Sequence, residues 1–282
     1  MSAELPDALI RDIVARALAE DTGPGDLTTR ATVDAGRTAR GEVIAKEDGV
    51  IAGLGVAVAT FRAVDPGLRF LAFVSDGERV GPGKAIARVA GSAQAILTAE
   101  RTALNFLQRM SGVATLTSRY VAAVAATGTQ IVDTRKTAPG LRALDKYAVR
   151  MGGGRNHRFG LYDGVLIKDN HIAAAGGITE AVALARRAIP HLVKIEVEVT
   201  DQTELEEALA AEAEVVMLDN MTPKEAAEAV RFIARRALVE ISGNVTLHNI
   251  DHYAECGADF ISVGALTHSA PALDLSLEIH TG

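Results

Sequence analysis

One stretch of the chain, from Asp133 to His171, concentrates residues that could bind a small anion. It reads DTRKTAPGLRALDKYAVRMGGGRNHRFGLYDGVLIKDNH and contains eight Lys or Arg against four Asp, together with two His. The whole chain carries 29 Lys and Arg against 36 Asp and Glu, which leaves 21 against 32 outside this stretch. A segment of net charge +4 therefore lies in a remainder of net charge −11. Because clustered cations attract and hold anions, we expect a site for a small, highly charged anionic ligand.

Within this stretch, the run MGGGRNHRFG combines three consecutive glycines with basic residues. A helix end needs only one glycine, so the other two indicate a backbone that approaches a ligand closely. Arginine can hold a carboxylate or phosphate through two parallel hydrogen bonds. Arg135, Lys136, Arg158 and Lys168 are therefore candidate anion ligands, with His157 beside them.

The elements that must position these residues follow a regular alternation that begins near Thr129. We expect short apolar strands at 130–133, 164–168, 193–199, 215–219, 238–242 and 259–264. We expect helices near 141–150, 178–188, 202–211, 223–236 and 246–255. Repeated strand–helix units imply a parallel sheet, and six of them suit a small α/β barrel. A doubly wound open sheet is the alternative, but no G-x-G-x-x-G follows the first strand.

Polar residues or glycines follow every one of these strands. They are Asp133, Arg135 and Lys136, then Lys168, Asp169 and Asn170, then Glu198, then Asp219 and Asn220, then Ser242 and Gly243, and finally Gly264. Because functional groups in parallel barrels collect at the carboxyl ends of the strands, we predict the site there. Glycine at the last two strand ends would let backbone N–H groups approach a phosphate.

The third strand carries three charges on one face, because Lys194, Glu196 and Glu198 alternate with apolar residues. A solvated antiparallel strand would show the same pattern. Inside a strand–helix repeat both faces are covered, so such charges must be paired or used. We assign a functional role to Glu198 and a structural pairing to at least one of Lys194 and Glu196.

The first part of the chain mixes helices and strands differently. An amphipathic helix around Leu9–Leu18 precedes strand-like pieces near 40–46, 68–74 and 85–89, with a helix between the first two. A long helix then runs to Met110, and Ser111-Gly112 is expected to break it before a second helix over Val113–Ala126. This pattern favours an N-terminal α+β layer over residues 1–112 and a barrel over 113–269. The alternation in ALDLSLEI allows the tail, 270–282, to return to the first domain as an edge strand.

Composition excludes several classes of protein. The chain has 282 residues, 48% of them hydrophobic, so it can build a sizeable core. A net charge of −7 and the absence of Trp argue against nucleic-acid binding. No signal peptide or membrane-spanning run is evident, which predicts a cytoplasmic protein. The one cysteine, Cys256, cannot form an internal disulfide.

Some charged residues need no functional explanation. Arg142, Lys146 and Arg150 recur at helical spacing, which is typical of a solvated helix face. Most of the histidines show no spacing that would pair them with a second metal ligand, and His171 is left undecided; the histidines set aside are His191, His248, His252, His268 and His280.

With these motifs in view, the sequence resembles the quinolinate phosphoribosyltransferase family, also called carboxylating nicotinate-nucleotide pyrophosphorylases. The resemblance covers nearly the whole chain and includes EDTGPGDLTT, AERTALNFLQRMSGVAT, the long basic stretch, IEVEV, MLDNM, EISGN and ISVGALTHS. It implies an α/β sandwich followed by an incomplete α/β barrel, and a homodimer with a shared active site. It also implies transfer of phosphoribose to quinolinate with decarboxylation in de novo NAD synthesis, with Mg²⁺ bound to the donor, phosphoribosyl pyrophosphate. Assembly beyond the dimer is left open.

The resemblance also implies a role for each candidate residue. Quinolinate would be held by Arg135, Arg158 and Lys168, with His157 nearby and Arg101 reaching in from the partner subunit. The donor would be bound by a second set of residues, which are Lys136, Glu198, Asp219, Ser242, Gly243 and Gly264. Glu198 and Asp219 would also hold the metal together with the substrate phosphates. Lys136, Lys168, Glu198 and Asp219 would be catalytic.

Three other functions fit parts of the pattern. A Schiff-base aldolase would use Lys168 as its nucleophile. A related phosphoribosyltransferase with another acceptor would keep the donor site but change the cations that hold a dicarboxylate. A catalytically silent metabolite sensor would be expected to lack Glu198 or Asp219, and both are present.

Overall fold

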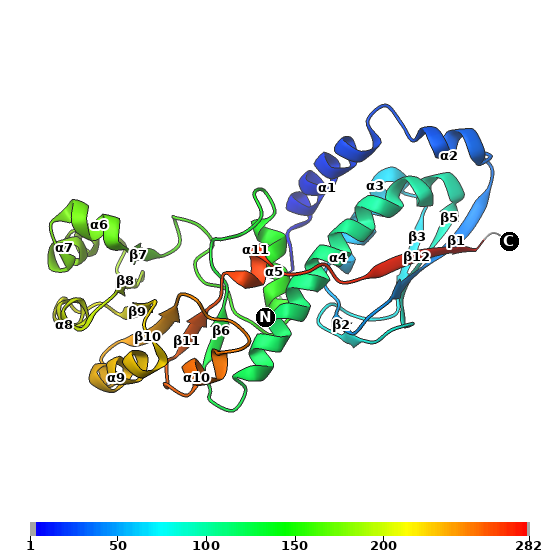
Figure 1. Ribbon diagram of the computed structural model, residues 1–282. Coiled ribbons are helices and arrows are strands. Elements are labelled where there is room, and N and C mark those ends of the chain that lie inside the picture. Colours follow the sequence, from blue (N-terminus) through cyan, green and yellow to red (C-terminus); the bar gives the residue numbers. More distant parts are fainter. Residues whose placement is uncertain (1–3, 281–282) are drawn as a thin grey trace. The chain divides into compact units, whose positions relative to one another are not determined.

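A computed structural model describes residues 4–280 of the chain. Within these residues two compact units can be distinguished (Figure 1). The first contains the chain up to Ser118, the segment Thr137–Gly153 and the end of the chain from Ser269. The second contains Arg119–Lys136 and Gly154–His268. The domain limits expected from the sequence, 1–112 and 113–269, remain predictions, because these units are defined by proximity and not by independent folding.

The first unit is built on an antiparallel sheet of four strands in the order β12-β1-β5-β3. The strands are β1 (Thr38–Ala45), β3 (Arg69–Ala72), β5 (Ala85–Ser92) and β12 (Leu275–His280), and β2 (Gly49–Val50) pairs with β4 (Arg79–Val80). The helices are α1 (Asp7–Thr22), α2 (Leu27–Thr32), α3 (Leu54–Val64), α4 (Ala93–Ala123) and α5 (Arg142–Met151). The alternating C-terminal segment therefore forms the edge strand β12, against β1.

Helix α4 is continuous through Ser111-Gly112, so the expected break at this point is wrong. The two residues serve packing instead. The Ser111 hydroxyl accepts a hydrogen bond from the Ala52 N–H at 3.0 Å. A Cβ on Gly112 would overlap the carbonyl oxygen of Pro271, so the glycine lets another segment lie directly on the helix. A glycine inside a helix can thus mark a close contact and not an end.

The second unit contains six parallel strands in the order β6-β11-β10-β9-β8-β7. They are β6 (Gln130–Val132), β7 (Val165–Ile167), β8 (Ile195–Val199), β9 (Val215–Asp219), β10 (Leu238–Ser242) and β11 (Phe260–Ser262). From β7 to β11, each strand pairs with the next strand in the chain, and the first strand, β6, pairs with the last, β11. In a doubly wound sheet, the order of the strands would instead reverse near the middle of the sheet. This order is that of a barrel open between β6 and β7, and it confirms the predicted incomplete α/β barrel.

Helices alternate with these strands, as Figure 1 shows: α6 (Asp169–Ala175), α7 (Ile178–Ala188), α8 (Gln202–Ala210), α9 (Pro223–Ile233), α10 (Ile250–Ala254) and α11 (Ala265–His268). Side chains such as Val197, Leu218 and Ile241 are fully or almost fully buried on one face of the sheet. The opposite face carries Glu196, Glu198 and Glu240, because strand residues two apart share a face and the register aligns these strands. That polar face lines the inside of the barrel.

Helix α5 carries the basic residues that the sequence assigned to a solvated face, and the assignment is wrong for Lys146. Its side chain is 1% exposed. Arg150 stacks over the ring of Tyr147 at 5.6 Å, and the Arg142 Nε–H donates to the Thr137 hydroxyl at 3.0 Å. This helix belongs to the first unit, so the residues of the basic stretch are divided between the two units.

Candidate active site

The carboxyl ends of β8, β9 and β10 bring together acids and a Ser-Gly turn. Glu198 is aligned with Met217, and Asp219 with Ser242, so all four side chains lie on the inner face of the barrel. Glu198 and Asp219 are both partly buried. The sequence prediction that these strand ends meet at one edge of the sheet is confirmed.

Lys168 meets Glu198 at this edge. Its Nζ forms an ion pair with the Glu198 Oε2, across the adjacent strands β7 and β8. Lys168 also begins helix α6, where its N–H donates to the His171 Nδ1 at 3.1 Å. The undecided histidine is therefore accounted for by the start of a helix. The lysine amine is thus held beside a carboxylate at the edge of the barrel.

The turn after β10 is shaped by close contact with the turn after β9. Gly243 has φ +94°, and a Cβ there would overlap the Asn220 side chain and lie 2.9 Å from the Asn220 nitrogen. The Asn220 amide donates to the Asp219 Oδ2 at 2.6 Å and accepts from the Asn244 amide at 3.0 Å. Only glycine fits this position without moving Asn220. The loop is therefore specific and not a generic Ser-Gly turn.

Lys136 and Gly264 lie together at the ends of β6 and β11. A Cβ added to Gly264 would lie 3.0 Å from the Lys136 Cδ and 3.2 Å from the His268 Nε2. The Thr267 hydroxyl donates to the Lys136 carbonyl at 2.9 Å. An exposed amine and a glycine backbone thus share one corner of the barrel, as an anionic phosphate would require.

The segment after the three glycines is anchored by Asp133, which is fully buried at the end of β6. Its carboxylate accepts the His157 N–H at 2.9 Å and the Asn156 amide at 2.6 Å. The Arg158 Nη1 donates to the Gly164 carbonyl at 3.1 Å. Burial and the nearby charge of Arg135 lower the pKa of Arg158. The two arginines are thus close enough to repel each other, and an anion would relieve that repulsion.

Glu196 and Glu240, to which the sequence prediction gave no functional role, lie deeper in the barrel. The His157 Nε2 is 2.9 Å from the Glu196 Oε2 and 3.7 Å from the Glu240 Oε2. Burial, followed by the charge of Glu196, raises the pKa of Glu240 to about 8. The structural pairing expected for Lys194 or Glu196 is confirmed for Glu196. The signal for Glu240 was a single acid in the middle of the otherwise apolar strand LVEIS.

These acids line a cavity of about 410 Å³ inside the second unit. His157 and Arg158 line it as well, together with the beginnings of several strands. Arg101 lies elsewhere, on the exposed side of α4 in the first unit. The predicted site residues therefore fall into three groups: the carboxyl edge of the barrel, the cavity, and the first unit.

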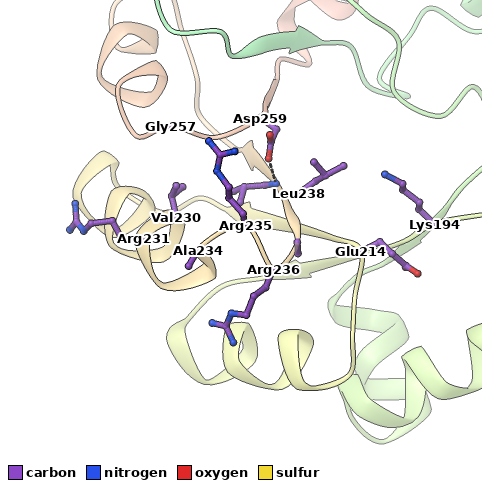
Figure 2. A pocket seen from close by; sticks show the side chains of 12 residues that line it. Lys194, Glu214, Val230, Arg231, Ala234, Arg235, Arg236, Leu238, Gly257 and Asp259 are labelled. Carbon is purple, nitrogen blue, oxygen red and sulfur yellow. Dashed lines mark hydrogen bonds between the residues drawn. The ribbon is translucent and has the colours of Figure 1, made fainter.

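A second cavity, of about 740 Å³, lies at the opposite ends of β8 to β11 (Figure 2). Arg231, Arg235 and Lys194 surround it, all exposed, and the Asp259 carboxylate on its wall accepts the Val239 N–H at 2.8 Å. It contains none of the predicted site residues. For that reason this basic hollow is not our candidate site.

None of the helices between residues 4 and 280 combines the length and apolarity needed to cross a membrane. The chain matches two sequence families described as the quinolinate phosphoribosyl transferase N-terminal domain, over residues 26–111, and the C-terminal domain, over residues 113–278.

Relatives from several organisms match over almost the whole chain. A nicotinate-nucleotide pyrophosphorylase [carboxylating] of Mycobacterium leprae is 47% identical over 275 residues, covering 95% of this chain and 96% of the relative. A probable nicotinate-nucleotide pyrophosphorylase [carboxylating] of Synechocystis is 46% identical over 267 residues, covering 93% and 90%. The solved nicotinate-nucleotide pyrophosphorylase of Francisella tularensis superposes with a TM-score of 0.95 at 40% identity, covering 99% of each chain.

Proposed function

Because this chain belongs to the quinolinate phosphoribosyltransferase family, we propose that it transfers phosphoribose from phosphoribosyl pyrophosphate to the ring nitrogen of quinolinate. The products are nicotinate mononucleotide, pyrophosphate and carbon dioxide, and the reaction belongs to de novo NAD synthesis. The observation that carries this proposal is the match of both family domains, combined with cations, acids and glycine turns at one edge of the barrel.

The acceptor is a dianion, so it needs fixed cations. Arg135 and Arg158 supply two cations, whose like charges repel each other. Lys168 supplies a third, which forms an ion pair with Glu198. His157 stands next to Arg158 and presents its ring to the interior of the barrel. Each charge-assisted contact to a carboxylate contributes about 1.5–3 kcal/mol, so two or three fix both the affinity and the orientation of quinolinate.

The donor fits the remaining corner of the edge. Lys136 provides a cation for the pyrophosphate, and the backbone at Gly264 and at Ser242-Gly243 provides N–H groups for the 5-phosphate. Glu198 and Asp219 hold the ribose hydroxyls. Their oxygen ligands also suit Mg²⁺, which prefers carboxylate, phosphate and water oxygens. When bound, the metal would neutralise charge on the departing pyrophosphate.

The chain's own contribution to the chemistry is orientation and charge. Departure of pyrophosphate leaves positive charge on the ribose ring, which Glu198 and Asp219 stabilise. The pyridine nitrogen forms the new bond to the ribose and becomes cationic. The 2-carboxylate then leaves as carbon dioxide, and its bonding electrons stay on the ring carbon, stabilised by that nitrogen until a proton is added. Because the ring itself accepts the electrons, no general base is needed for decarboxylation.

We also propose that two chains form a homodimer in which Arg101 of each completes the partner's acceptor site. An exposed arginine on α4, within the motif AERTALNFLQRMSGVAT of the family resemblance, supports this. We place the protein in the cytoplasm, because its doubly charged and pyrophosphate-bearing substrates do not cross a membrane unaided.

The test is to incubate the protein with quinolinate, phosphoribosyl pyrophosphate and Mg²⁺ and to detect nicotinate mononucleotide by mass. Arg135→Ala should raise the KM for quinolinate about tenfold to a hundredfold. Arg231→Ala removes an exposed arginine at the opposite end of the strands and is the matched control. Product from nicotinate and none from quinolinate would favour a related transferase, and a lysine adduct trapped by borohydride would favour an aldolase.

A further inference from the structure

Beneath the predicted acceptor site, one imidazole faces two buried carboxyl groups. Glu196 on β8 and Glu240 on β10 are 6% and 3% exposed, and each has one oxygen, Oε1, with no hydrogen-bond partner within the described part of the chain. The register explains their meeting: Glu196 is aligned with Val215 and Glu240 with Met217 on the intervening strand. Both therefore point into the barrel from strands only one apart.

The hydrogen bonds around His157 fix its tautomer. The Arg158 N–H donates to the His157 Nδ1 at 2.8 Å, so Nδ1 is an acceptor and carries no proton. The proton of the neutral ring is then on Nε2, which points at the Glu196 Oε2 2.9 Å away. The backbone N–H of His157 is held separately by Asp133 at 2.9 Å. Ring and backbone are thus fixed by different acids.

Two full negative charges side by side in this interior would be costly, and the structure shows how the cost is avoided. Glu240 is the more buried of the two, and burial together with the charge of Glu196 raises its pKa to about 8. The Glu196 Oε2 lies 2.9 Å from the His157 Nε2 and the Glu240 Oε2 lies 3.7 Å from it, so Glu196 is the acid that holds the ring.

We propose that the buried Glu196 and Glu240 position the His157 ring, and through it the neighbouring Arg158, for the carboxylates of the acceptor. This inference rests on the proposed function, because it assigns an acceptor to the same site. The two acids are positioning residues and do not touch the reacting atoms.

A metal ion is the other explanation for these three side chains, whose ligand atoms lie within 4.8 Å of one another. A metal would need the free electron pair of Nε2, but the contact between the Arg158 N–H and Nδ1 places the ring proton on Nε2. Arg158 also adds a positive charge close to Glu196. Geometry and charge therefore favour a positioning role for the two acids over a cation site.

The test compares Glu196→Gln, Glu240→Gln and a control, Glu214→Gln, a substitution of the same type at the residue that precedes β9. Glu214 binds the Ile195 N–H at 2.9 Å and borders the other cavity. Glu196→Gln should raise the KM for quinolinate about tenfold and leave the KM for phosphoribosyl pyrophosphate unchanged. Circular dichroism and unfolding curves show whether each variant is folded.

Nitrogen NMR of the imidazole rings provides a readout independent of turnover. It should show the Nε2–H tautomer of His157 in the wild type and in Glu240→Gln, and a change in Glu196→Gln. An unchanged quinolinate KM and ring spectrum in Glu196→Gln would refute the proposal, as would tight Mn²⁺ binding that is lost in Glu240→Gln. A wild-type protein that forms no nicotinate mononucleotide would refute the proposed function instead, and the ring spectra would still decide the pair.

Discussion

Replacing Glu240 by glutamine should change how the stability of the protein depends on pH. The side chain is 3% exposed and faces Glu196, His157 and Lys168, with Ser262 hydrogen-bonded to it. Burial and the charge of Glu196 raise its pKa from 4.5 to about 8 in the folded chain. Because its folded pKa is raised, the carboxyl stabilises the fold fully below its unfolded pKa, and this stabilisation is lost as pH rises through about 8.

The magnitude follows from the width of that window. In the unfolded chain the carboxyl ionises near its ordinary pKa, whereas in the folded chain it keeps its proton until about pH 8. One pKa unit corresponds to about 1.4 kcal/mol, so the wild type should lose about 4 kcal/mol between about pH 5 and pH 9 through this one group. Glutamine cannot ionise, so the variant should lack this loss.

Urea unfolding of both proteins at about pH 5, 7 and 9 measures the effect. The contributions of all other titrating groups to the free energy of unfolding cancel when the two proteins are compared. The wild type should lose stability relative to Glu240→Gln as pH rises. Infrared difference spectra should show a protonated carboxyl at neutral pH in the wild type that is missing in the variant. Parallel unfolding curves across this range, or no such carboxyl band, would show that Glu240 is ionised in the fold.

Further expectations concern the glycines and the metal. Gly243→Ala should cost roughly 1–3 kcal/mol and raise the KM for phosphoribosyl pyrophosphate, because φ is +94° and the new Cβ would displace Asn220; thermal unfolding and kinetics measure both. Gly112→Ala would favour an isolated helix by about 1 kcal/mol but should destabilise this protein, since Pro271 lies against α4; a raised melting temperature would contradict the contact. Chelation of Mg²⁺ should abolish turnover without altering the melting temperature of the ligand-free protein, and full activity in excess chelator would refute metal dependence.

The barrel could be predicted from the sequence because its signals are local and repeated. Each short apolar run with a polar end, such as VVMLD, forms a strand over the expected residues, here Val215–Asp219. Side chains at those ends then share an edge, because parallel strands in one sheet end on the same side. That argument places Glu198 and Asp219 together without any knowledge of the three-dimensional contacts.

Features that depend on contacts between distant segments could not be predicted in this way. Ser111-Gly112 has the composition of a helix break, and only the neighbouring Pro271 explains why the helix continues. Lys146 has the spacing of a surface residue, yet it is buried. The pairing of Glu196 with Glu240 needs the register of three strands, which periodicity within one strand does not provide.

The charges on β8 and α5 explain how the net basic stretch could indicate an anion site although several of its cations have other roles. Glu198 forms an ion pair with Lys168, and Glu196 is bound by His157. The three cations on α5 belong to the other unit. Under the proposed function, the anionic acceptor and donor would be held by Arg135, Lys136, Arg158 and Lys168. The net charge of the stretch therefore indicates an anion site but does not by itself say which of its cations serve that site.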